Sequence, residues 1–388
     1  MSNAPLPAIT DDRFYLEISS PPDTSKHSYS TAGAYQRAFC NQQCLDGILT
    51  WLKEEISANA RVYPSNTALP SIWEVVNGTA ITVDNLRLVL VPTLAFDGDE
   101  LRVPQEWVDI PEFIADYYLA VMLNPDEEWM TISGYTTHHK LKTIAAYDAG
   151  DRTYSLDSDD LIRDINVLWV SRQYSQENLR AEITALPNLP KAQADNLLQR
   201  LGNPDIKFPR LQVPFALWGA LLAHGGWRQY LYELRQGITQ ESIQQRSLTK
   251  WLQDGLQNEV SNLTQLLGWN QKMIRLRTGM RGNAPILGFS RQLQIAGNPY
   301  ELCVFPFGNP ESQAWRFELR SIVVGNHIPI GFKLRLLTED LQSFENNEDI
   351  VIAAVDSLYV DVIVEPGEGI VWETEPLAEE CDREILRF

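Results

Sequence analysis

Basic and aromatic residues gather between positions 269 and 281, and they form the candidate binding segment of this sequence. Lys272, Arg275, Arg277 and Arg281 supply four cations within ten residues, next to Trp269 and with no acid among them. Cations beside an aromatic ring can hold a nucleic-acid backbone or stack on a base. They can equally bind an acidic protein segment, either the acidic C-terminal part of this chain or a partner. Because the chain carries a net charge of −19, we favour the protein contact, first with the chain itself, over nucleic acid.

The cysteines and histidines do not predict a metal site. Cys40 and Cys44 lie four residues apart on an expected helix, where β-carbons are about 5–6 Å apart. A disulfide needs about 3.5–4.5 Å, and a zinc site needs four ligands that this region does not supply. His138 and His139 are adjacent in a region predicted to be extended, so their side chains would point to opposite faces. We therefore expect two buried structural thiols and no metal.

Motifs of the common enzyme classes are not found in the sequence. It has neither a G-x-S-x-G nucleophile elbow nor a glycine-rich phosphate loop. Asp205 and Lys207 are similar to the acid-x-lysine half of a metal-dependent nuclease site, but they lie between predicted helices, where no strand brings a second carboxylate. We therefore expect no cofactor and favour a protein that is not an enzyme. An enzyme with an unfamiliar site of carboxylates and His138 or His139 is the alternative.

The charge of the chain is concentrated near its C-terminus. Residues 338–384 contain 15 acidic residues and one basic residue, a net charge of −14 out of −19. Such a surface repels nucleic-acid phosphates and anionic membranes, so it is either a solubilising face or a docking surface for a basic partner. No apolar run reaches the ~20 residues that span a bilayer. The polar N-terminus does not have the pattern of a secretory signal, and we expect a cytoplasmic protein.

The order of the hydrophobic patterns predicts an α+β protein in four parts. Residues 1–32 are a loose lead-in, and 33–156 combine a helix over 34–56 with a small, mostly antiparallel β-sheet or barrel. Within it, the run 87–91, which is apolar after Arg87, predicts a strand buried on both faces. Residues 157–284 are a helical region that ends in the basic connector. Short β-type runs at regular spacing from 285 to 388 predict an acidic β-sandwich-like domain.

The helical region contains four predicted helices. The first begins after Asp157 or Ser158 and runs to about residue 172. The second runs from Pro190 to Gly202, since proline favours a first turn and glycine follows a last one. The third covers 215–234 with an interruption near Gly225, and the fourth covers 242–267.

Four stretches of the sequence resemble, in this order, a cyanobacterial family of uncharacterised proteins catalogued as domain of unknown function eighteen-twenty-two. They are AYQRAFCNQQCLDGILTWL, the segments LRLVLVP, LRVPQEWVDIP and ADYYLAVMLN, then LGNPDIKFPRLQVPFALWGALLAHGGWRQYLYELRQG, and SLTKWLQDGLQNEVSNLTQLLGW. Trp218, Trp227, Arg228 and Arg235 are its most family-like positions. The resemblance implies a cytoplasmic protein of regulatory role, acting with a protease or transcription-related partner, and implies no catalytic residue.

These observations together predict a non-enzymatic protein-interaction protein. Its candidate partner-binding residues are Trp269, Lys272, Arg275, Arg277 and Arg281. The alternatives are the hydrolase-like enzyme described above and a module that binds nucleic acid or carbohydrate. The sequence leaves the partner and the oligomeric state open.

Overall fold

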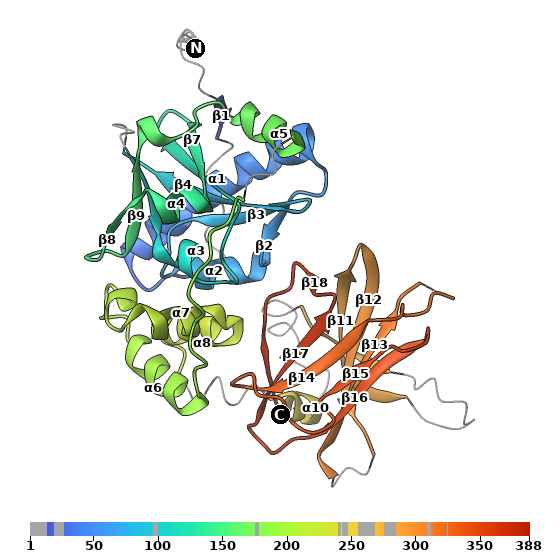
Figure 1. Cartoon of the computed structure of the whole chain (residues 1–388). Helices are drawn as coiled ribbons and strands as arrows, with labels where there is room; N and C mark the ends of the chain where they lie inside the picture. Colours follow the sequence, from blue (N-terminus) through green and yellow to red (C-terminus); the bar gives the residue numbers. More distant parts are fainter. Residues whose placement is uncertain are drawn as a thin grey trace, which may run out of the picture. The chain divides into compact units, whose positions relative to one another are not determined.

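The structure is a computed structural model, in which the chain forms two compact units (Figure 1). The first unit comprises Met1–Pro187 and Leu201–Ala223, and the second comprises Asn188–Arg200 and His224–Phe388. The helices of the region 157–284 are therefore shared between both units. The structure describes residues 14–18, 27–95, 100–174, 178–239, 242, 247–254, 268–274, 285–308, 312–323 and 325–388.

A six-stranded sheet forms the centre of the first unit. Its strand order is β1 (Phe14–Glu17), β7 (Trp129–Thr137), β6 (Tyr117–Asn124), β4 (Leu86–Thr93), β3 (Thr79–Val83), β2 (Arg61–Tyr63). All neighbours are antiparallel except β4 and β6, which are parallel. The sheet is open, with β1 and β2 at its edges. Of the two predicted alternatives, a sheet or a barrel, the chain therefore forms a sheet. Leu88, Val89 and Leu90 are completely buried, which confirms the predicted strand with two covered faces.

One long helix covers this sheet. α1 (Ala32–Trp51) continues into a short π-helix, η2 (Leu52–Ile56), and packs against β4, β3 and β6. The hydroxyl of Thr31 caps its start by accepting a hydrogen bond from the Ala34 amide at 3.1 Å. The predicted helix over 34–56 is confirmed, and Cys40 and Cys44 on it are buried free thiols.

Smaller elements complete the first unit beside the main sheet. A three-stranded antiparallel sheet has the order β5 (Glu100–Pro104), β9 (Thr153–Asp157), β8 (Ala146–Asp148). The short helices are η3 (Asn66–Ala68), α2 (Leu69–Trp73), α3 (Gln105–Asp109), α4 (His138–Thr143), η4 (Ser158–Asp160), α5 (Ile165–Tyr174), η5 (Pro209–Leu211) and α7 (Phe215–Ala223). The extended conformation expected at His138 and His139 is wrong, because Thr137 caps a helix there and accepts a hydrogen bond from the Lys140 amide at 3.2 Å.

The predicted helices of the middle region are largely present. α6 (Lys191–Leu201) begins after Pro190 and ends before Gly202, as expected. The helix expected over 215–234 is two helices, α7 and α8 (Gly225–Arg235), because His224 leaves the helical conformation and caps α8. The sequence predicts a helix that begins after Asp157 or Ser158 and runs to about residue 172. The chain forms only the 3-10 turn η4 at its expected start, and the α-helix α5 begins at Ile165. α10 (Leu248–Asp254) falls within the helix expected over 242–267, much of which lies outside the described residues.

Two antiparallel sheets form the acidic C-terminal part of the second unit. The first has the order β10 (Asn270–Ile274), β11 (Ile286–Ile295), β12 (Asn298–Pro306), β13 (Ala314–Ser321), β16 (Ser357–Ile363), with β18 (Ala378–Glu379) pairing with β11. The second has the order β15 (Glu348–Ile350), β14 (Lys333–Thr338), β17 (Gly369–Glu375), β19 (Ile385–Arg387). Phe317 and Leu319 from the first sheet and Leu336 and Trp372 from the second share one core. This confirms the predicted α+β class with a sandwich-like C-terminal part.

Candidate functional site

A pocket of about 260 Å³ lies within the first unit. Its lining contains four cationic side chains and one carboxyl group, although the chain as a whole is acidic. It is lined by Arg37, Glu74, Val75, Asn77, Arg102, Pro104, Thr153, Lys207, Phe208, Pro209 and Arg210. These residues come from α1, the end of α2, β5, β9 and the segment that leads into η5.

The segment before η5 supplies the most accessible side chains of the pocket. Phe208 is 64% exposed, although it is a large apolar residue, and Lys207 beside it is exposed as well. Within the described part of the chain, Lys207 has no ion-pair partner. A turn at Asn203 starts the segment, because the Asn203 side chain accepts a hydrogen bond from the Asp205 amide at 2.9 Å. Two consecutive residues of this segment therefore bring an ammonium group and an aromatic ring to the pocket, both open to solvent.

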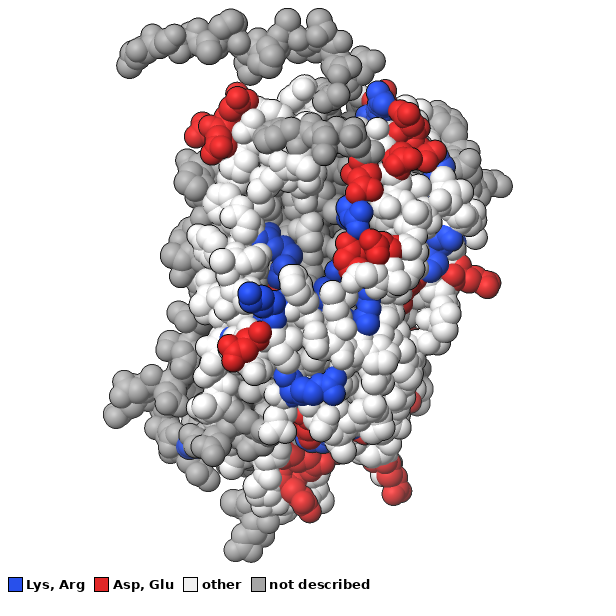
Figure 2. All heavy atoms as spheres, turned by 90° about the vertical axis from the view of Figure 1, so that its left-hand side faces the viewer, with Lys and Arg blue, Asp and Glu red and all other residues white. Residues whose placement is uncertain are grey.

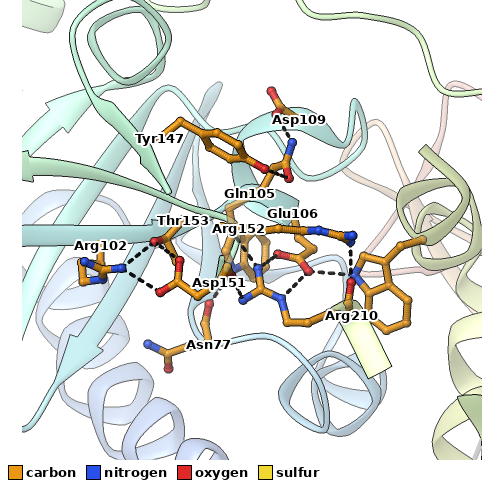
Figure 3. Close-up of polar contacts among 12 residues, drawn as sticks. Asn77, Arg102, Gln105, Glu106, Asp109, Tyr147, Asp151, Arg152, Thr153 and Arg210 are labelled. Carbon is orange, nitrogen blue, oxygen red and sulfur yellow. Dashed lines mark hydrogen bonds and ion pairs between the residues drawn. The ribbon is translucent and has the colours of Figure 1, made fainter. Parts of the chain in front are cut away.

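A buried carboxylate fixes the other end of this segment. Glu106 on α3 has no exposed surface, and its two oxygens accept hydrogen bonds from Arg210 Nε at 2.8 Å and Nη2 at 2.5 Å. The indole of Trp218 on α7 donates a third hydrogen bond at 2.7 Å. We call Glu106, Arg210 and Trp218 the Glu106 clasp; Figure 3 shows its ion pair between Glu106 and Arg210. Because Glu106 balances the charge of Arg210, this arginine adds little net charge to the pocket.

A second arginine ties the same segment to the β8–β9 hairpin. Arg152 adopts a left-handed backbone conformation, with φ of 56°, at the turn of this hairpin. Its guanidinium donates to the carbonyl of Val213 at 2.6 Å and to that of Arg210. In return, Arg210 Nη1 donates to the carbonyl of Asp151 at 2.8 Å. The segment that carries Lys207 and Phe208 is thus held to the hairpin as well as to α3.

Carboxylates surround the cation on the opposite wall. Arg102 contacts Asp151 at 2.7 Å and donates to the hydroxyl of Thr153 at 3.0 Å (Figure 3). It also contacts Glu100 at 2.9 Å and Asp148 at 3.6 Å. The hydrogen bonds that Arg102 donates to Glu100 and Asp151 raise the pKa of this arginine. An incoming anion would compete with these carboxylates for Arg102, whereas Lys207 is available. Figure 2 shows the same intermixing over one face of the molecule, where basic and acidic side chains lie next to one another.

A comparison with known protein families identifies the chain. The model of the family described as Protein of unknown function (DUF1822) matches residues 25–387. The chain belongs to this family. No curated protein and no solved structure matches it. The resemblance that the four sequence stretches indicated is therefore confirmed, and the family description attaches no reaction to the pocket.

The basic segment that the sequence singled out in this DUF1822 member lies elsewhere, in the second unit. Trp269 is only 1% exposed and belongs to the core of the sandwich, where its indole donates to Glu384 at 2.9 Å. It is therefore not an open aromatic platform. Lys272 lies on β10 and pairs with Glu301 on β12. The remaining predicted residues, Arg275, Arg277 and Arg281, lie outside the described residues.

The two adjacent histidines have different surroundings. His138 is fully buried, with Nε2 2.8 Å from the carbonyl of Val108 and Nδ1 accepting from the amide of Ala181 at 3.0 Å. Burial lowers the pKa of His138, so the neutral ring ties two backbone segments together. His139 is exposed at the start of α4. Among the described residues, no three His, Cys, Asp or Glu side chains are grouped so that they could hold a metal ion.

A second polar network lies behind α3. The hydroxyl of Tyr147 donates to Gln105 at 2.8 Å, and Gln105 donates to Asp109 at 2.8 Å (Figure 3). Asp109 also accepts from Tyr154 at 2.8 Å and from Lys142 at 2.7 Å. Burial raises the pKa of Tyr154, which keeps its hydroxyl protonated as a donor. This network joins α3, α4, β8 and β9, and so supports the wall of the pocket.

Among the described helices, none is both long and apolar enough to cross a bilayer.

Proposed function

We propose that this DUF1822 protein is a non-enzymatic protein-interaction protein of regulatory role, whose pocket binds an acidic segment of a protein partner. The observation that carries the proposal is the pair at the mouth of the pocket. Lys207 is a cation without an ion-pair partner in the described part of the chain, and Phe208 beside it is 64% exposed. A partner segment with a carboxylate next to an apolar side chain complements both groups.

The energetics favour a contact of this kind. Fully burying a phenylalanine side chain contributes roughly 1.5–3 kcal/mol, and a charge-assisted hydrogen bond to Lys207 adds to it. The segment 203–214 is already held by the Glu106 clasp and by Arg152, and Pro204, Pro209 and Pro214 restrict its backbone. Binding therefore costs little ordering entropy on this side of the contact.

The size of the pocket supports a side-chain ligand. Sites for drug-sized ligands and cofactors measure roughly 300–1,000 Å³, whereas this pocket measures about 260 Å³. It accommodates one or two side chains of a partner, while the rest of the partner segment lies over Phe208.

Photo-crosslinking tests the proposal. A photoreactive amino acid in place of Phe208, in the full chain, should capture one dominant protein from a lysate of the organism that encodes the chain. The matched control places the same group at Val170, which is 59% exposed on α5. Identical capture at both positions would contradict the assignment of the surface.

Affinity measurements with the captured partner then identify the contacts. Phe208→Ser and Lys207→Glu should each weaken binding about tenfold or more, which corresponds to about 1.4 kcal/mol. Lys207→Glu should also reduce the salt dependence of binding, because the charge pair is lost. Val170→Ser should leave the affinity unchanged. Unchanged affinity in Lys207→Glu would refute an acidic partner, and a turnover abolished by a point mutation in the pocket would refute the non-enzymatic function.

A further inference from the structure

The outer edge of β16 in the second unit is open for pairing. Among the described strands, β16 pairs with β13 alone, and it ends its sheet. The amide of Val364 donates to the carbonyl of Gln313 at 3.2 Å. This bond shows which alternate residues of β16 direct their backbone groups towards β13. In an antiparallel pair, alternate residues bond to the neighbour, so Val360 and Val362 bond to β13. Asp361 and Ile363 then direct their N–H and C=O groups away from the sheet, and the described part of the chain gives them no backbone partner.

Natural sheet edges are usually protected, and this one is not. Lysine, proline, a bulge or an inward-pointing charge normally blocks pairing with another chain. β16 has the sequence SLYVDVI, whose single charge, Asp361, is neutralised by Arg316 through two hydrogen bonds of 2.7 Å. Ile363 is 73% exposed on the same face. The amide of Tyr359 is covered, since it donates to the side chain of Asp349 at 3.3 Å.

Exposed apolar side chains border this edge. β15, the edge strand of the other sheet, packs beside β16 (Figure 1). Ile350 at its end is 42% exposed, and Ile352 just beyond is 89% exposed. Ile330 is 70% exposed. Its loop is joined to the segment between β15 and β16 by a hydrogen bond of 2.7 Å from the amide of Ile328 to the carbonyl of Val355. Exposed apolar residues near the start of β16, together with Ile363 at its end, offer apolar contacts to a bound segment.

We propose that β16 accepts an extended, basic segment of a partner protein as an added strand, hydrogen-bonded to Asp361 and Ile363. Main-chain hydrogen bonds would supply affinity, and apolar side chains of the segment would cover Ile363 and its neighbours. The charge of the segment follows from the composition of this part of the chain, because residues 338–384 carry a net charge of −14. A second copy of the chain is the weaker occupant, because it would bring a second region of net charge −14 against the first.

Hydrogen exchange on the full chain tests this surface directly. In the free chain, the amides of Asp361 and Ile363 should exchange faster than those of Val360 and Val362. The probe is a seven-residue peptide of alternating valine and lysine with blocked ends, compared with its valine–glutamate counterpart at equal ionic strength. The lysine peptide should slow exchange at Asp361 and Ile363 severalfold, and the glutamate peptide should not.

Two charge-introducing variants complete the test. Ile363→Lys should abolish the protection, because a lysine on the edge blocks strand addition. Leu377→Lys is the matched control, since Leu377 is 76% exposed outside β16, and it should leave the protection unchanged. Unslowed exchange with the lysine peptide, or equal protection in Ile363→Lys, would overturn the proposal. Concentration-dependent protection without peptide, with a dimer in sedimentation, would assign the edge to a second copy instead.

Discussion

Replacing Arg210 by methionine tests the Glu106 clasp, because it leaves the Glu106 carboxylate buried without its guanidinium. Glu106 has no exposed surface and would retain only the Trp218 indole as a hydrogen-bond donor. Removing one partner of a buried ion pair costs about 3–5 kcal/mol, since an uncompensated charge is left in the interior. We expect Arg210→Met to destabilise the first unit by this amount. The carbonyls of Asp151 and Arg152 lose a donor as well, at 2.8 Å and 3.1 Å.

The double variant Glu106→Gln/Arg210→Met separates this cost from simple loss of packing. It removes both charges and keeps the volumes, a change that is often close to neutral for a buried pair. We expect it to be more stable than Arg210→Met alone, with a coupling energy of about 2 kcal/mol or more in the double-mutant cycle. Native-state hydrogen exchange at β6 amides such as Leu119 reports the opening free energy of the first unit alone. Additive costs of the two single changes would show that the pair is not coupled and would refute the reasoning.

Three further predictions concern buried positions. Gly288→Ala would place a methyl group 2.6 Å from Ile274 Cδ1 and 2.8 Å from the Val304 carbonyl, so it should lower the free energy of unfolding of the sandwich by about 1–3 kcal/mol in urea titrations. Burial lowers the pKa of His224 to about 3 in the folded protein, below the value of about 6.5 in the unfolded chain. Between these two values the unfolded state binds a proton that the folded state does not bind. The free energy of unfolding should therefore fall as the pH decreases from about 6.5 towards 3. By pH 4, wild type should lose about 3 kcal/mol relative to His224→Asn, which retains a capping group. Burial also raises the pKa of the Cys44 thiol, so a thiol reagent should modify it only after unfolding, which mass spectrometry would detect.

Continuous apolar patterns made much of the fold predictable. The strands β4 and β6 are buried on both faces, so their sequences are almost uninterrupted runs of apolar residues. β17 is harder to recognise in the sequence, because acidic residues alternate with buried ones in its second half. Its alternation is nevertheless present, since Trp372 and Thr374 point into the core while Glu373 and Glu375 point out.

The candidate site was less predictable, because its contacts join distant parts of the chain. Glu106 and Arg210 are 104 residues apart, and neither stands out in an acidic sequence rich in such residues. Lys207 was noticed only as half of a nuclease-like pair, although the prolines around it indicated a rigid segment. Trp269 lies beside basic residues in the sequence, but the Glu384 carboxylate near the C-terminus holds its indole in the core. Sequence neighbours therefore did not reveal which side chains share a surface.

The two proposed surfaces differ in charge, and this difference makes them separable by experiment. The pocket presents the ammonium group of Lys207, so it selects a carboxylate and repels a basic segment. The edge of β16 lies in a region of net charge −14, so it selects a basic segment and repels an acidic one. Lys207→Glu should therefore weaken the partner captured at Phe208 and leave exchange at Asp361 unchanged, and Ile363→Lys should do the reverse. Independent losses would mean that the two surfaces bind segments of opposite charge separately, whereas loss of peptide protection at Asp361 in Lys207→Glu would contradict their independence.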